Sequence, residues 1–149
     1  MKKSSSLRVA LGSREHLEVI LALESSEPKP IGLFIVQSVS AKVRKQSAIK
    51  LAKSMGKGIN QIRLSAIAGE SIEETERSLN AIFSLAERYD AALFFDEADA
   101  LFGKREAGVA KALRAQLTQF AVCVIAGATS FARSDRYWHE HLLAILHEA

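Results

Sequence analysis

Short runs of apolar residues separated by helix-like segments constrain the fold of this 149-residue chain most strongly. Continuous apolar runs occupy residues 31–36, 91–95 and 121–126, and a shorter strand-like segment covers 59–64. Strands that are apolar on both sides are typical of a parallel sheet with helices on both faces. The alternation therefore predicts a compact three-layer α/β domain whose mostly parallel sheet has four or five strands.

The segments between these runs have the spacing and the end signals of helices. Ser13 is placed to cap a helix, and two prolines at positions 28 and 30 prevent any helix from continuing. Ser71 opens a capping-box pattern with Glu74. The predicted helices cover residues 14–24, 42–55, 72–86, 106–119 and 135–147, and residues 7–11 form a weakly indicated edge strand. We expect one domain, with a helix and linker over 1–30, a core over 31–130 and a final helix within 131–149.

Composition excludes several classes of protein. With 48% hydrophobic and 25% charged residues, the chain is an ordinary globular sequence and not a disordered one. No run of about 18 apolar residues is present, so we expect no membrane-spanning helix. The single cysteine, Cys123, cannot form an internal disulfide and fits a reducing compartment. The expected location is therefore the cytoplasm.

The net charge of +3 is unevenly distributed. Residues 1–60 hold 11 Lys or Arg against 4 Asp or Glu, a net charge of +7, and residues 61–149 hold 9 against 13, a net charge of −4. A basic half fits the phosphates of a nucleotide or a nucleic acid, and it equally fits a solvated helix face. Because no aromatic residues interleave the lysines and no reader motif is present, nucleic acid is the least favoured partner.

The segment with the clearest candidates for metal binding and catalysis follows the apolar run at 91–95. Asp96 and Glu97 come directly after this run, and Asp99 follows two residues later. A carboxylate at a strand tip can hold Mg²⁺, and the next one can orient and deprotonate a water for attack on a phosphate. Adjacent acids at this position also fit a plain solvated turn.

Residues 93–105 resemble the Walker B segment of AAA-type (AAA+) P-loop ATPases over their whole length. Residues 69–83 resemble the helix that precedes this segment in that family, and residues 64–66 resemble the strand end before that helix. The resemblance covers roughly residues 30–130. It implies a P-loop core that binds ATP and Mg²⁺, and the chain has no room for the small helical lid that normally follows.

The resemblance also implies roles for individual residues. Asp96 would coordinate Mg²⁺, and Glu97 would polarise the hydrolytic water. Lys42, which lies 54 residues before Asp96, fits the spacing of the phosphate-binding lysine. Ser130 stands where the family has a polar residue that senses the γ-phosphate, and Ser40 would help Lys42 to attract an anion at the helix N-terminus.

The Walker A loop departs from the family pattern. Residues 36–43 contain no glycine, although glycines let successive backbone amides curl around a phosphate. Val39 and Val43 resist such a conformation, and Val43 also replaces the hydroxyl that would ligate Mg²⁺. Arg133 and Arg136 lie near the usual place of an arginine finger, but without a recognisable motif, and we expect them to be surface residues.

Two functional hypotheses therefore stay open. The first is an AAA ATPase module that binds Mg-ATP with weak or no hydrolysis, through Ser40, Lys42, Asp96 and Ser130 and with Glu97 as the base. The second is a catalytically inactive module that keeps the ATPase fold and docks on other AAA subunits. Both hypotheses predict a protein partner, either a second copy or another AAA subunit.

Overall fold

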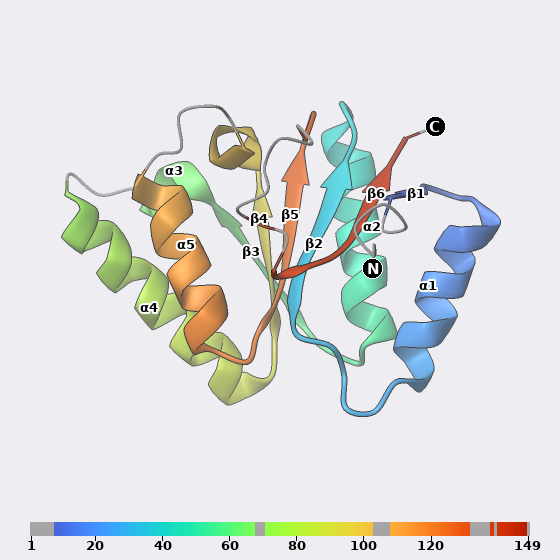
Figure 1. Cartoon of the computed structure of the whole chain (residues 1–149), viewed down its shortest axis with the longest axis horizontal. Helices are drawn as coiled ribbons and strands as arrows, with labels where there is room; N and C mark the ends of the chain where they lie inside the picture. Colours follow the sequence, from blue (N-terminus) through green and yellow to red (C-terminus); the bar gives the residue numbers. More distant parts are fainter. Residues whose placement is uncertain (1–7, 68–70, 103–107, 132–137, 139, 149) are drawn as a thin grey trace.

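A computed structural model of the chain describes residues 8–67, 71–102, 108–131, 138 and 140–148. The order of the elements along the chain is shown in Figure 1. The elements are β1 (Arg8–Ala10), α1 (Arg14–Ser25), β2 (Gly32–Gln37), α2 (Ala41–Ser54), β3 (Ile59–Arg63), α3 (Leu64–Ile67), α4 (Ile72–Tyr89), β4 (Ala92–Asp96), η2 (Ala98–Phe102), α5 (Gly108–Gln119), β5 (Cys123–Ala128) and β6 (Leu142–His147).

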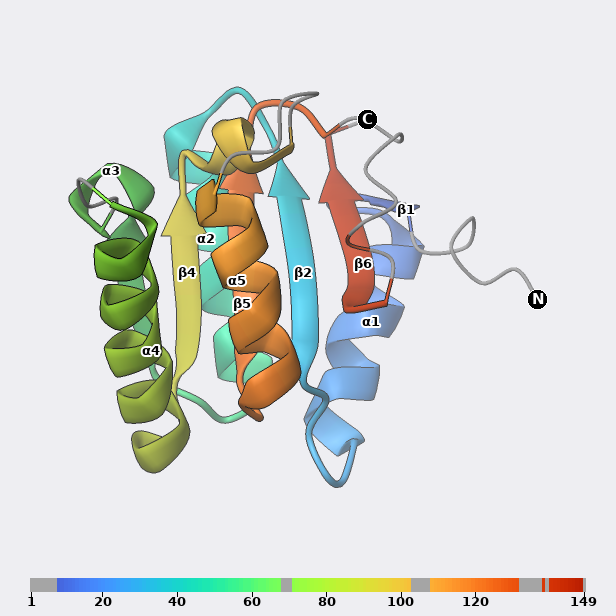
Figure 2. The same ribbon diagram turned by 60° about the vertical axis from the view of Figure 1, so that its left-hand side comes forward.

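The described strands form one sheet with the order β1-β6-β2-β5-β4-β3, in which every pairing is parallel. Helices α1 and α2 cover one face, and α4 and α5 cover the other (Figure 2). Each face has its own apolar cluster, with Phe34, Leu51 and Ile125 on the α1–α2 side and Phe83, Phe95 and Leu113 on the α4–α5 side. This arrangement confirms the predicted three-layer α/β fold.

The last element differs from the prediction. Residues 142–147 form strand β6 and not part of a helix over 135–147. β6 lies between β1 and β2, and its side chains enter both apolar clusters: Leu142 and Ile145 on one face, and Ala144 and Leu146 on the other. An apolar segment that is buried on both sides is typical of a strand inside a parallel sheet, and residues 142–147 form such a strand. With β1, which confirms the edge strand expected at 7–11, the sheet has six strands in the described chain and not four or five.

Serine side chains fix the starts of three helices. Ser13, Ser40 and Ser71 have extended backbones and accept hydrogen bonds from the amide three residues further on, at 3.1–3.2 Å. Each bond satisfies an amide that the first helical turn leaves without a partner. Two of these caps were predicted, and the cap at Ser40 places the start of α2 directly above the carboxyl end of β2.

The chain leaves β2 and β4 toward opposite faces at the carboxyl edge of the sheet. From β2 it enters α2 on one face, and from β4 it passes through η2 to α5 on the other, while β5 lies between β2 and β4. Ligand crevices in open α/β sheets form where the chain direction diverges in this way. The described residues after β5 contain no helical lid subdomain. None of the described helices is both long and apolar enough to cross a lipid bilayer.

Candidate functional site

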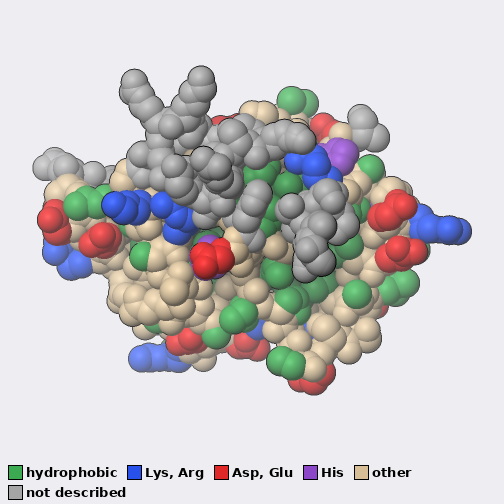
Figure 3. All heavy atoms as spheres, viewed as in Figure 1, with side chains coloured by type: hydrophobic (Ala, Val, Ile, Leu, Met, Phe, Trp, Pro, Cys, Tyr) green, Lys and Arg blue, Asp and Glu red, His purple; other side chains and the backbone are tan. Residues whose placement is uncertain are grey.

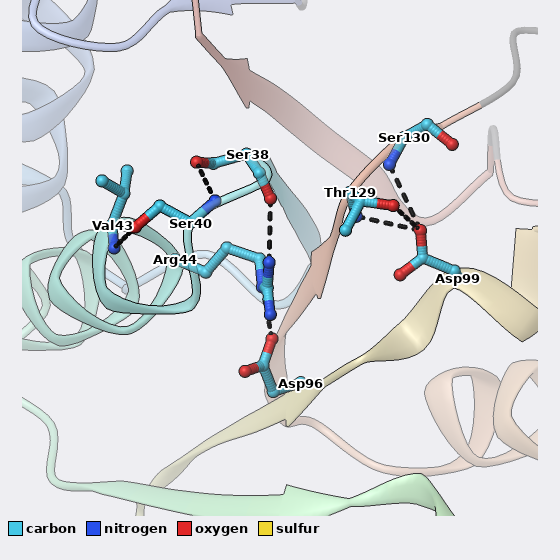
Figure 4. A network of polar contacts seen from close by, with 8 residues as sticks. All are labelled: Ser38, Ser40, Val43, Arg44, Asp96, Asp99, Thr129 and Ser130. Atoms are coloured by element: carbon cyan, nitrogen blue, oxygen red, sulfur yellow. Dashed lines mark hydrogen bonds and ion pairs between the residues drawn. The ribbon is translucent and has the colours of Figure 1, made fainter.

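Asp96 lies at the carboxyl end of β4 and is bound to a cation from this chain. Its Oδ1 accepts a hydrogen bond from Nε of Arg44 in the first turns of α2, at 2.7 Å. The Arg44 Nη1 donates to the backbone carbonyl of Ser38 at 2.9 Å. Figure 4 shows the guanidinium lying between these two acceptors. The two side chains are only 7% and 10% exposed, so this is a buried ion pair that links α2 to β4.

Gly127 in β5 provides the space for this pair. A Cβ atom at this position would lie 2.5 Å from Oδ1 of Asp96 and 3.3 Å from Cδ of Arg44. Real Cβ atoms do not approach a carboxylate oxygen so closely, so any side chain here would displace the ion pair. The absence of a side chain at residue 127 is therefore part of the site.

The segment between β2 and α2 is a tight three-residue connection. The amide of Ser40 donates to Oγ of Ser38 at 3.0 Å, and the amide of Val43 donates to Oγ of Ser40 at 3.2 Å. The Ser38 amide donates to the carbonyl of Ala128 in β5 at 3.0 Å. These three amides are thus used within the protein, whereas a phosphate-binding nest needs amides that point together at the ligand. Val39 at the tip is 80% exposed.

Lys42 lies on the exposed side of the first turn of α2. It forms no hydrogen bond or ion pair with the residues that the structure describes, and Arg44 is the basic residue that reaches Asp96. Although it lies among the exposed lysines of α2, Arg44 is itself buried, with 5% of the residue exposed. The structure brings together Asp96 and Arg44, and it leaves Lys42 in solvent.

Glu97 and Ser130 lie at the same edge of the sheet. Glu97 is exposed and has a left-handed backbone with φ of 57°, which turns the chain sharply after β4. Ser130 is also exposed, and its amide donates to Oδ2 of Asp99 at 3.3 Å. The same oxygen accepts the amide of Thr129 at 2.9 Å and the Thr129 hydroxyl. Figure 4 shows this second cluster apart from the ion pair.

Three residues of the site were not predicted from the sequence: Ser38, Arg44 and Gly127. The spacing of α2 contained a signal for one of them, because Arg44 precedes Ala48 by four residues and Leu51 by seven. These positions share one helix face, and both apolar residues are fully buried. Asp99 belongs to the predicted acidic segment, but its bonds to residues 129 and 130 depend on the tertiary fold.

The described side chains do not fit a Mg-nucleotide at this edge. Asp96 is already neutralised by a guanidinium, and Val43 has no hydroxyl to offer a metal. Among the described residues, no group of three or more His, Cys, Asp or Glu side chains could hold a metal ion. Arg133, Arg136 and the Lys104–Arg105 end of the acidic segment lie outside the described residues.

The described residues also give no support for a cysteine nucleophile or for nucleic-acid binding. Cys123 begins β5, and burial raises the pKa of its thiol to about 12, so it is not a nucleophile at neutral pH. On the face shown in Figure 3, acidic side chains lie near the described Lys and Arg side chains, so the described part of this face is not uniformly basic.

Comparisons with known proteins agree with this fold. The family model described as "ATPase family associated with various cellular activities (AAA)" matches residues 46–137. The match begins after Arg44 and so leaves out the connection between β2 and α2. The solved structure of the FIGL-1 AAA domain in complex with ADP superposes with a TM-score of 0.66 at 14% sequence identity.

That superposition covers 91% of this chain and 52% of the FIGL-1 chain, so the present chain spans about half the length of its structural relative. No curated protein matches it. At this identity the structural likeness shows the fold, a P-loop NTPase-like core. The family model supplies the identification, because it matches more than half of the chain: the protein belongs to the AAA ATPase family.

Proposed function

We propose that this AAA domain acts as a protein-binding module that does not hydrolyse ATP. The observation that supports the proposal is the buried ion pair between Arg44 and Asp96. Asp96 is the residue that the family resemblance assigns to Mg²⁺, and a cation of the chain itself already neutralises it. The guanidinium thus replaces the charge that a bound metal would bring.

Nucleotide binding would have to disrupt this arrangement. A Mg²⁺ ion on Asp96 would separate the carboxylate from Arg44 and leave a buried guanidinium without its partner. Loss of one partner from a buried pair costs about 3–5 kcal/mol, which weakens binding about 10²- to 4 × 10³-fold. Exposed Lys42 without a glycine-rich loop offers only a point charge in return.

Calorimetric titration with Mg-ATP and with Mg-ADP tests the nucleotide half of the proposal. We expect no saturable heat at millimolar nucleotide. Phosphate release from Mg-ATP by the wild type should equal that by the Glu97→Gln variant, which lacks the base that the family pattern would use. Saturable binding, or faster release by the wild type than by Glu97→Gln, would overturn the proposal.

The partner that we propose is another AAA-fold subunit, in the cytoplasm that the single buried cysteine fits. Two pairs of exposed apolar side chains support a docking role, Leu17 with Leu21 on α1 and Leu85 with Tyr89 on α4. Each pair is spaced four residues apart and therefore shares one helix face. Helices α1 and α4 form opposite flanks of the domain (Figure 1), as head-to-tail contacts between subunits require.

Sedimentation of the chain, alone and mixed with full-length AAA ATPases of its source organism, tests docking. We expect a complex whose affinity falls about tenfold in Leu21→Glu and in Leu85→Glu, because a buried charge opposes an apolar contact. The matched controls Ala22→Glu and Ser84→Glu add the same charge at the adjacent exposed positions and should bind as the wild type does. A monomer in every mixture, or equal losses in the controls, would contradict docking through these flanks.

A further inference from the structure

A second candidate site lies between α1 and α2, away from the Arg44–Asp96 pair. It is a cavity of about 450 Å³ at the N-terminus of α1, bordered on the α2 side by Lys50. Its volume is in the range of small-molecule pockets. None of its lining residues belongs to the site at the carboxyl ends of β2 and β4. The inference below does not rest on the Arg44–Asp96 pair, although Leu17 of its lining also belongs to the α1 flank proposed for docking.

The charged side chains that line this cavity have one sign. Arg14 and Lys50 line it, and no carboxylate is among its described lining residues. The N-terminus of α1 adds the positive end of a helix dipole and is capped by Ser13, which also lines the cavity, whereas Glu15 in the first turn is not among the lining residues. These charges repel one another unless an anion lies between them.

His16 contributes a buried donor without an acceptor. The residue is 7% exposed, and its Nδ1 accepts a hydrogen bond from the amide of Gly12 at 2.9 Å. The proton of the neutral ring is therefore on Nε2, which has no hydrogen-bond partner. Burial, and then the charge of Lys50, lowers the pKa of His16 below its usual 6.5, so the ring is neutral at pH 7. An oxygen acceptor from a ligand would satisfy this buried donor.

The local sequence builds this geometry. Gly12 has a φ of +80°, a conformation that suits glycine and turns the chain from β1 into α1. The turn presents the Gly12 amide to Nδ1 four residues later, and it thereby fixes which ring nitrogen carries the proton. Leu17 and Ile20 add an apolar wall on the next turns of the helix.

We propose that this cavity binds the phosphoryl group of a small organic phosphomonoester. Arg14 and Lys50 neutralise the phosphoryl oxygens, Nε2 of His16 donates to one of them, and the organic part packs on Leu17 and Ile20. The Nε2 atom is itself covered, so binding requires a shift of lining side chains. Three of these lining residues, Arg14, Leu17 and Lys50, are exposed.

The imidazole resonances of His16 provide the test, with phenyl phosphate and inorganic phosphate as probes. We expect a saturable shift with phenyl phosphate and binding about tenfold tighter than that of inorganic phosphate, because only the ester buries apolar surface. Arg14→Gln and Lys50→Gln should each weaken phenyl phosphate binding about three- to fivefold, as loss of an exposed cation does. Lys53→Gln removes the same charge from α2 at an exposed position outside the cavity, and it should leave the affinity unchanged.

Three results would overturn the proposal. The first is no saturable shift of His16 up to about 20 mM of either probe, since weaker binding is not a specific site. The second is an equal loss in Lys53→Gln and Lys50→Gln, which would indicate general charge screening. The third is equal affinity for the two probes, which would make a free oxyanion the ligand and not a phosphomonoester.

Discussion

Two polar clusters lie at the same edge of the sheet and differ in burial. The first, the buried pair, consists of Arg44 and Asp96 with the Ser38 carbonyl. The second, the exposed clamp, consists of Asp99 with Thr129 and Ser130. Both join segments far apart in sequence, yet only the buried pair removes two charges from water. Figure 4 shows the two clusters apart from each other.

The difference in burial explains why this ATPase fold needs a cation beside Asp96 although its side chains do not fit a Mg-nucleotide. A carboxylate at the tip of β4 must be compensated by a cation because it is buried. In the family pattern that cation is a metal ion, and here it is a guanidinium from α2. The exposed clamp needs no such cation, since the half-buried Asp99 carboxylate accepts hydrogen bonds from Thr129 and Ser130 and is partly open to water.

The largest expected effect is the loss of one partner of the buried pair. Arg44→Ala should lower the free energy of unfolding by about 3–5 kcal/mol, because it leaves the Asp96 carboxylate buried and unpaired. Urea denaturation measures the change. The double variant Arg44→Met/Asp96→Leu should recover much of the loss, since it removes both charges. A loss below about 1 kcal/mol in Arg44→Ala would show that the pair is not buried in solution.

A smaller effect is expected from filling the space beside the pair. Gly127→Ala places a methyl group against the Asp96 carboxylate and should destabilise the fold by about 1–3 kcal/mol, as overpacking does. The matched control is Gly58→Ala, where nothing lies within 4 Å of the added Cβ. Thermal unfolding of the two variants checks the prediction. Equal melting temperatures would contradict the assigned role of residue 127.

The exposed clamp should contribute less than the buried pair. Asp99→Ala removes a half-buried acceptor of three hydrogen bonds from the exposed residues Thr129 and Ser130, and we expect a loss of about 1 kcal/mol. Amide exchange at Thr129 and Ser130 should become faster, because their amides lose the Asp99 oxygen. A loss as large as that of Arg44→Ala would remove the distinction between the two clusters.

The smallest effect is expected at Lys42. Because this side chain is exposed and makes no polar contact with the described residues, Lys42→Ala should change the unfolding free energy by less than about 0.5 kcal/mol. Chemical denaturation in parallel with Arg44→Ala gives the comparison. A large loss would mean that Lys42, two residues before Arg44, shares in the buried network.

Much of this fold can be predicted from the sequence, because apolar runs 31–36, 91–95 and 121–126 each span a buried strand almost completely. The apolar residues 142–146 fall within the helix predicted over 135–147, because a short apolar run alone does not distinguish a strand from a helix. It forms a strand because it pairs with β1 and β2 in the folded sheet. The same limit applies to the site. The position of Asp96 at a strand tip follows from the local pattern, whereas its partner lies 52 residues away and depends on how α2 packs on the sheet.

The side-chain Nε–H resonance of Arg44 tests the central claim most directly, by NMR of the full chain with and without millimolar Mg-ATP. A buried, charge-assisted hydrogen bond to Asp96 protects this proton from solvent exchange. The account predicts a slowly exchanging resonance that disappears in Asp96→Asn and does not move when Mg-ATP is added. A resonance that exchanges as fast as those of exposed arginines, or that shifts saturably with Mg-ATP, would contradict it.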